Sequence, residues 1–212
     1  MYRILTYSSI ISILIPLICC VIKYKTHSTI LWVLFTYIIF STLTEILSLF
    51  LPNYSIKNYF LSQNIFAVTE FLLISVLYYL EFKIKITQRI ILYISIAYIC
   101  FVLIELGITG KYLQANTIIS LIEACILSMF AIYFFFNVQT ELSIPRLTDY
   151  SFFWINCGVA IYFSTSIILF AFDDYISKCG EKEVEQLWGL HLFCNILYNI
   201  LLSVGVWKIR QK

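Results

Sequence analysis

The chain has 212 residues and a net charge of +2, and it is 61% hydrophobic but only 12% charged. Its mean hydropathy of +0.91 lies far outside the range of soluble domains, so lipid or other helices are expected to surround most side chains. No loop is long enough to hold a soluble catalytic or nucleic-acid-binding domain. Function is therefore expected inside the membrane region or on the short loops.

Seven apolar stretches follow one another along the chain and predict seven transmembrane helices. A helix rising about 1.5 Å per residue needs about 20 residues to cross a hydrocarbon core about 30 Å thick. The spans are expected to be helices because backbone groups in lipid find no water to bond, and the alternating pattern of a barrel strand is missing. The predicted spans are 4–21, 30–51, 59–80, 88–107, 115–136, 151–172 and 187–207. Residues 1–212 are thus expected to form one all-α, polytopic membrane domain, a single seven-helix bundle.

Lys and Arg are distributed unevenly between the two sides of this topology. The side that holds the amino terminus carries Arg3, Lys57, Lys111, Lys178 and Lys182. The opposite side carries Lys23, Lys25, Lys83, Lys85, Arg89, Arg146, Lys208, Arg210 and Lys212. Because cytoplasmic loops are enriched in Lys and Arg, this predicts an external amino terminus and a cytoplasmic carboxy terminus in the plasma (inner) membrane. The basic face fits a topology signal and contact with lipid headgroups better than a nucleic-acid site.

Ionisable residues interrupt five of the predicted spans. In chain order these are Glu45 in the second span, Glu70 in the third, Glu105 in the fourth, Glu123 in the fifth and His191 in the seventh. An ionisable group inside a span costs on the order of 3 kcal/mol on insertion scales, so each one requires a physical reason. No Lys or Arg lies at a comparable depth in the sequence, so these acids have no predicted ion-pair partner.

Helical spacing indicates that these polar groups share a cavity. At about 100° per residue, His191, Asn195 and Asn199 form one stripe on the seventh span. Turning the polar faces of five helices inward predicts a cavity that opens to the outside. The predicted ligand-binding residues are Glu45, Glu70, Glu123, His191, Asn195 and Asn199. The acidic last outer loop would make the mouth negative and favour cations. In the structural alternative, each Glu is protonated and only holds helices together, at about 0.6–2 kcal/mol per hydrogen bond.

The sequence offers little for catalysis or for a cofactor. The chain has two histidines and no Cys-x-x-Cys pair, which disfavours a zinc site, and no residue spacing demands another metal. The motifs of serine and aspartyl intramembrane proteases are missing, and no Lys lies in the middle of the last span to hold retinal. A non-enzymatic function without metal or cofactor is therefore favoured.

Several short motifs resemble a known group of membrane proteins. They are Phe153-Trp154-Ile155-Asn156-Cys157-Gly158 with Tyr162-Phe163, the run His191-x3-Asn195-x3-Asn199, Gly205-Val206-Trp207, and Glu70-Phe71. Together they resemble small stand-alone seven-helix bacterial membrane proteins, some of which are similar to the membrane sensory regions of two-component histidine kinases. The resemblance implies membrane sensing or signalling. Unlike a full sensor kinase, this protein is expected to have no cytoplasmic catalytic region.

The leading hypothesis is a sensory or regulatory membrane protein that binds a small or cationic ligand, or protons, in the outward-facing pocket. One alternative is a cation or proton-coupled transporter or channel that uses the same carboxylates as relay sites. A second alternative is a structural membrane protein without a ligand. The expected partners are membrane lipids, a small-molecule or ion ligand and a signalling partner at the cytoplasmic face, but no nucleic acid.

Overall fold

The computed structural model describes residues 2–26, 28–110, 116–141, 146–176 and 178–209, without the side chains of residues 51–54, 140–141, 174 and 181. Every regular element within these ranges is a helix. Seven helical segments are long and apolar enough to cross a membrane: Tyr2–Thr26, Thr29–Phe50, Ile56–Glu81, Lys85–Thr109, Thr117–Gln139, Ser151–Ala171 and Lys182–Trp207. The predicted all-α fold with seven helices of membrane-spanning length is confirmed.

The first span is divided into two helices, and the other spans are continuous. It consists of α1 (Tyr2–Ser12) and α2 (Leu14–Lys23), followed by the 3-10 turn η1 (Tyr24–Thr26). The break falls at Ile13 because Pro16 has no amide hydrogen to donate to the Ser12 carbonyl. The remaining elements are α3 (Thr29–Tyr54), α4 (Ile56–Glu81), α5 (Lys85–Thr109), α6 (Thr117–Glu141), η3 (Leu147–Asp149), α7 (Ser151–Ala171), α8 (Asp173–Ile176) and α9 (Glu181–Trp207).

The ends of the helices differ from the predicted spans where polar residues continue a helix beyond its apolar part. The helix α9 begins at Glu181 rather than at residue 187, because the acids Glu183 and Glu185 suit the positive end of a helix dipole. The helix α6 begins at Thr117, and Asn116 caps it by accepting a bond from the Ile119 amide at 3.3 Å. Its predicted first residue, 115, lies outside the described residues, as do Lys111, Arg210 and Lys212 of the charge comparison.

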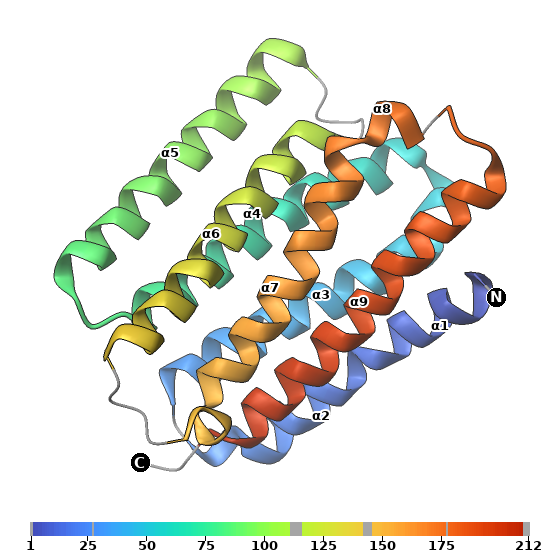
Figure 1. The fold of residues 1–212 in the computed structure, drawn as a ribbon. Helices are drawn as coiled ribbons and strands as arrows, with labels where there is room; N and C mark the ends of the chain where they lie inside the picture. The colour runs from blue at the N-terminus through green and yellow to red at the C-terminus, as the bar shows by residue number, and fades with distance from the viewer. Residues whose placement is uncertain (1, 27, 111–115, 142–145, 177, 210–212) are drawn as a thin grey trace.

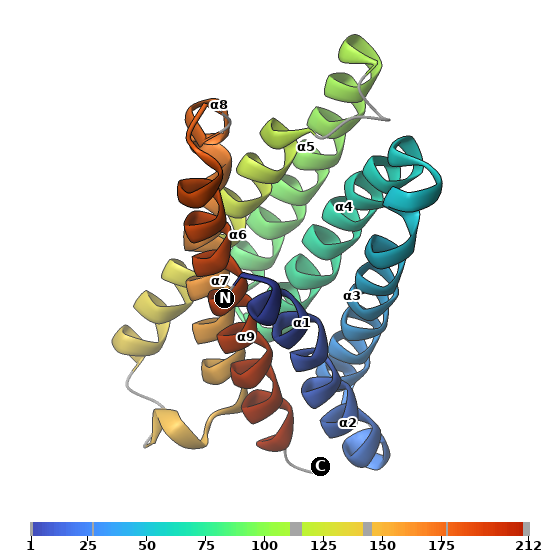
Figure 2. The same ribbon diagram turned by 90° about the vertical axis from the view of Figure 1, so that its right-hand side faces the viewer.

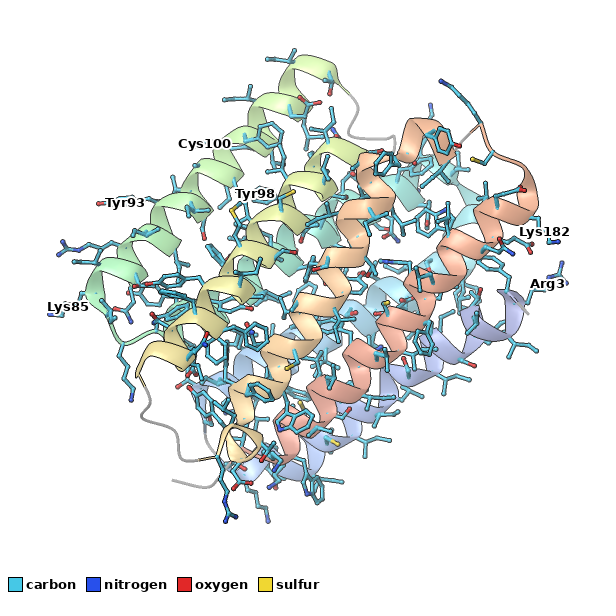
Figure 3. The ribbon with its side chains drawn as sticks, viewed as in Figure 1. Arg3, Lys85, Tyr93, Tyr98, Cys100 and Lys182 are labelled. Atoms are coloured by element: carbon cyan, nitrogen blue, oxygen red, sulfur yellow. The ribbon has the colours of Figure 1, made fainter. Side chains whose placement is uncertain are left out.

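Six of the seven spans form a ring, and α5 lies outside it. Around the ring, the span made of α1 and α2 packs on α3, followed by α4, α6, α7 and α9, which returns to α1 and α2 (Figures 1 and 2). The helix α5 packs on α4 and also reaches α6 through a bond of 3.2 Å between the hydroxyl groups of Thr87 and Tyr133. Tyr98 of α5 is buried against the bundle, whereas Tyr93 points away from it (Figure 3). The sequence predicted that the fourth span would turn a polar face into the shared cavity. The structure instead places this span, α5, outside the ring, and none of its described residues lines the cavity.

The bundle has two distinct ends. We call the end where α1, α4, α6 and α9 begin the N-side end, and the end where α2, α4, α6 and α9 finish the C-side end (Figure 1). Arg3 and Lys182 project at the N-side end, and Lys85 projects at the C-side end (Figure 3).

The helices α7 and α9 approach closely because small residues lie at their contact. A Cβ atom added to Gly158 would lie 2.8 Å from Cδ2 of Tyr198. One added to Gly205 would lie 2.6 Å from Cγ1 of Ile155 and 3.1 Å from the Ser151 carbonyl oxygen. The Ser151 hydroxyl donates to the Gly205 carbonyl at 2.8 Å, which adds a hydrogen bond to this close packing.

Candidate functional site

A cavity of about 410 Å³, lined by acidic, polar and aromatic side chains, lies inside the ring and reaches toward the N-side end. It lies between α4, α6, α7 and α9, with α8 at its rim. Its lining comprises Tyr59, Phe60, Gln63, Asn64, Phe66, Ala67, Glu70, Asn116, Thr117, Ser120, Glu123, Ala124, Tyr162, Phe163, Ser166, Phe170, Asp173, Trp188 and His191. On α4 the lining runs from Tyr59 to Glu70, a rise of about 16 Å at 1.5 Å per residue. The cavity thus extends from the exposed Asp173 at the rim to acids buried deep in the bundle.

Glu70 lies near the middle of α4 and forms the deep end of the cavity. It is 6% exposed, and its Oε1 accepts a hydrogen bond of 2.8 Å from the Tyr37 hydroxyl of α3. Glu45, also on α3, is half-buried and lies within electrostatic range of Glu70, but it is not among the lining residues. Of the predicted site residues, Glu45 is therefore near Glu70 but does not line the cavity.

Glu123 and Asn116 occupy one face of α6, two helical turns apart. Glu123 is 3% exposed, and its Oε1 has no hydrogen-bond partner among the described residues. Asn116 is 7% exposed, and its Nδ2 also lacks a partner there, although its Oδ1 caps α6. Buried polar groups are nearly always hydrogen-bonded, so two unpartnered groups on one cavity wall indicate a place for a ligand or water.

His191 is held between aromatic rings on the opposite wall. Its ring centroid lies 5.0 Å from that of Tyr162 and 5.9 Å from that of Trp188, which meets it edge-on at 89°. Its Nδ1 has no hydrogen-bond partner among the residues that the structure describes. These two ring contacts hold the imidazole in position and leave Nδ1 for another group.

An aromatic column connects the His191 wall with Glu70. Tyr162 of α7 stacks on Tyr198 of α9 at 5.1 Å and 12°, and Tyr198 lies 6.3 Å from Tyr37. Tyr37 in turn donates to Glu70. Four helices of the ring therefore contribute to one continuous contact path beside the cavity.

The cavity is closed toward the C-side end by tightly packed side chains. One and two turns beyond Glu70, Ile74 and Tyr78 are each 1% exposed. The Tyr78 hydroxyl donates to Oδ1 of Asn156 at 2.6 Å, and Nδ2 of Asn156 donates to the Ala131 carbonyl at 3.2 Å. Asn156 is 0% exposed and thus joins α4, α6 and α7 beneath the cavity. Its polar atoms are satisfied within the protein, so this centre is structural.

Asn195 and Asn199 connect α9 to α1 by hydrogen bonds. Their Nδ2 atoms each donate at 2.8 Å, Asn195 to the Ser9 hydroxyl and Asn199 to the Ser12 hydroxyl of α1. Neither residue lines the cavity. Of the six predicted binding residues, the structure therefore brings Glu70, Glu123 and His191 to one cavity, and it turns the two asparagines toward α1.

The chemistry of the lining favours cations. It contains three carboxylates, Glu70, Glu123 and Asp173, and no Lys or Arg among its described residues. No cluster of three or more His, Cys, Asp or Glu within the described ranges is arranged to hold a metal ion. The arrangement therefore suits binding of a cationic group by acids and aromatic rings.

Two residues beside the cavity are not singled out by the sequence. Tyr37 belongs to none of its polar patterns, and Asn156 occurs only within a motif. A buried tyrosine hydroxyl usually finds a partner, so a tyrosine in the middle of a span was the available signal for Tyr37.

Comparison of the chain with protein-family models, curated proteins and solved structures finds no match.

Proposed function

We propose that this chain is a sensory or regulatory protein of the plasma (inner) membrane that takes up a small cationic ligand, or protons, in the acidic cavity. One observation carries the proposal. Glu123, Asn116 and His191 each hold a buried atom without a hydrogen-bond partner among the described residues, and all three line the same cavity as Glu70. Helix-locking polar groups would instead be paired with one another, as Asn156 is.

We further propose that the cavity faces the outside. It lies at the N-side end, which carries five Lys and Arg in the sequence against nine at the other end. The positive-inside rule then places the C-side end in the cytoplasm. The exposed carboxylate of Asp173 at the rim would attract cations from that side.

Binding is favoured over transport by the packing beneath Glu70. A permeation route would need polar or hydrated space leading on to the C-side end. Ile74, Leu77 and Tyr78, which follow Glu70 on α4, are instead 1–2% exposed. In this proposal, occupation of the cavity alters contacts between helices, and a partner reads the change at the basic C-side loops.

The proposal is tested with the full chain reconstituted in lipid nanodiscs. We expect tetramethylammonium or ethanolammonium to raise the unfolding temperature, because a ligand at 100 times its Kd stabilises the folded state by about 2.7 kcal/mol. Glu123→Gln and His191→Ala should each reduce this shift. Glu105→Gln is the matched control, because Glu105 lies on the outer helix α5 and not in the cavity.

A flux assay separates the transport alternative. Glu70 of α4 lies within electrostatic range of both Glu45 of α3 and Glu123 of α6, and this series of acids on three helices favours a relay. In proteoliposomes, a sensor should show no proton or cation flux above that of protein-free vesicles. Flux that Glu70→Gln abolishes would establish the transporter instead, and no cation-dependent stabilisation in any variant would favour the structural alternative.

A further inference from the structure

We propose that the ligand of this cavity is a protonated organic amine that carries a neutral hydrogen-bond acceptor at its other end. This inference rests on the proposed function and makes it specific. It follows from the separate positions of the acids, the aromatic rings and Asn116 in the cavity.

The deep end of the cavity selects the ammonium group. Glu70 on α4 and Glu123 on α6 both line this end and lie within electrostatic range of each other. Oε1 of Glu70 is engaged by Tyr37, whereas Oε1 of Glu123 has no partner among the described residues. An ammonium group offers several N–H donors and a charge opposite to that of a carboxylate, so it matches Glu123 in hydrogen bonding and in electrostatics.

The walls select an organic body over a bare ion. Seven of the lining residues are Phe, Tyr or Trp: Tyr59, Phe60, Phe66, Tyr162, Phe163, Phe170 and Trp188. Aromatic faces attract organic cations and cover apolar groups, but they do not replace the oxygen ligands of a hard metal ion. A volume of about 410 Å³ also falls in the range of small-molecule sites, about 300–1,000 Å³.

The outer part of the cavity selects the acceptor. Asn116 has an unpartnered amide nitrogen, which is a donor, and it lies two helical turns from Glu123. Two turns correspond to about 10 Å along α6, which sets the approximate separation of the two ligand groups. Asp173 lies at the same end and no Lys or Arg lines the cavity in its described residues, so a neutral acceptor is favoured over a carboxylate.

The test uses four small molecules that share a six-carbon chain and differ only in their end groups. They are 6-aminohexanamide, which has both groups, hexylamine, hexanamide and 6-aminohexanoate. Binding to the nanodisc-embedded protein is followed by calorimetry and by the fluorescence of Trp188, with Trp188→Phe identifying its signal. We expect 6-aminohexanamide to bind about 3- to 10-fold more tightly than hexylamine, the range of one neutral hydrogen bond. Hexanamide and 6-aminohexanoate should bind more weakly than 6-aminohexanamide.

Two variants assign the groups to their residues. Glu123→Gln should weaken both amines about 10- to 100-fold, because it removes a charged hydrogen-bond partner. Asn116→Asp keeps the cap of α6 but loses the amide donor, so it should remove the preference for 6-aminohexanamide over hexylamine. Asn116→Ser, another good capping residue, is the second variant if the first does not fold.

The outcomes separate this inference from the proposed function. If 6-aminohexanamide and hexylamine bind equally, or if the preference survives in the folded Asn116 variant, the ligand has no acceptor group, while Glu123-dependent cation binding still stands. If tetramethylammonium binds but none of the four probes does, the inference fails alone. If no cation binds at all, both fail.

Discussion

Buried polar residues of this protein fall into two groups according to their partners. Asn156, Asn195 and Asn199 donate to neighbouring helices and complete a contact. Glu123, Asn116 and His191 each keep a buried atom without a partner among the described residues. The first group stabilises the fold, and we propose that the second, whose members all line the cavity, binds the ligand. The distinction depends on individual atoms rather than on residue type, since asparagine occurs in both groups.

The hydrogen bond between Tyr78 and Asn156 gives the first prediction at this scale. Asn156→Leu leaves the Tyr78 hydroxyl buried without its partner, so we expect the free energy of unfolding to fall by about 1–2 kcal/mol. Tyr78→Phe should remove much of this penalty when it is combined with Asn156→Leu. Unfolding of the two single variants and the double variant in nanodiscs measures the coupling, and strictly additive effects would contradict a direct bond.

At the scale of elements, the contact between α7 and α9 depends on two glycines. Gly205→Ala would bring a Cβ atom to 2.6 Å from the Ile155 side chain and 3.1 Å from the backbone of Ser151. The backbone of α7 cannot relieve this clash by a rotamer change, as a side chain could. We therefore expect the free energy of unfolding to fall by about 1–3 kcal/mol in this variant. Gly158→Ala should cost less, because its nearest neighbour is the ring of Tyr198.

A matched control for these glycine variants exists on α5. Gly107 has no atom within 4 Å of an added Cβ, so Gly107→Ala should be neutral or slightly stabilising, by up to about 1 kcal/mol of helix propensity. Thermal unfolding of the three variants ranks them. A penalty for Gly107→Ala as large as that for Gly205→Ala would show that backbone propensity, and not close packing, governs these positions.

The seam between α1 and α9 gives a second prediction at the element scale. Asn195→Ala and Asn199→Ala each remove one amide bond to a serine of α1, so each should lower the unfolding free energy by about 0.5–1.5 kcal/mol. Cation affinity should stay unchanged, because neither side chain lines the cavity. Asn58→Ala, at an exposed position of α4, serves as the control. If the variants lost cation binding without losing stability, the asparagines would be part of the binding site.

At the scale of the whole molecule, seven membrane crossings, an odd number, would place the two ends of the chain on opposite sides of the membrane. The Lys and Arg distribution predicts an external amino terminus. A green fluorescent protein fused after Lys212 should therefore fluoresce in the cytoplasm, and an epitope tag before Met1 should be labelled on intact spheroplasts. Labelling of the tag only after permeabilisation would reverse the orientation and place the cavity on the cytoplasmic side.

The ring of six spans explains why α5 contributes no residue to the cavity lining. The helix α5 packs outside α4, and its residue Glu105 is half-buried at the edge of the bundle. The polar faces of the second, third, fourth, fifth and seventh spans were expected to meet. Only those on α4, α6 and α9 do so, together with Tyr162 and Ser166 of α7. An apolar helix can lie within the ring or outside it, because lipid and neighbouring helices are both apolar surroundings for its side chains.

The number, order and approximate length of the helices were contained in the sequence, because about twenty consecutive apolar residues can cross lipid only as a helix. The same local information indicated that Glu70, Glu123 and His191 need a polar environment. Only the tertiary structure decided that these three line one cavity while Asn195 and Asn199 bind α1. Which helix meets which is set by contacts between distant residues, such as Ser9 with Asn195 and Tyr37 with Glu70. Such pairings follow from the close packing of whole helices, and the periodicity of a single span does not indicate which helices lie next to it.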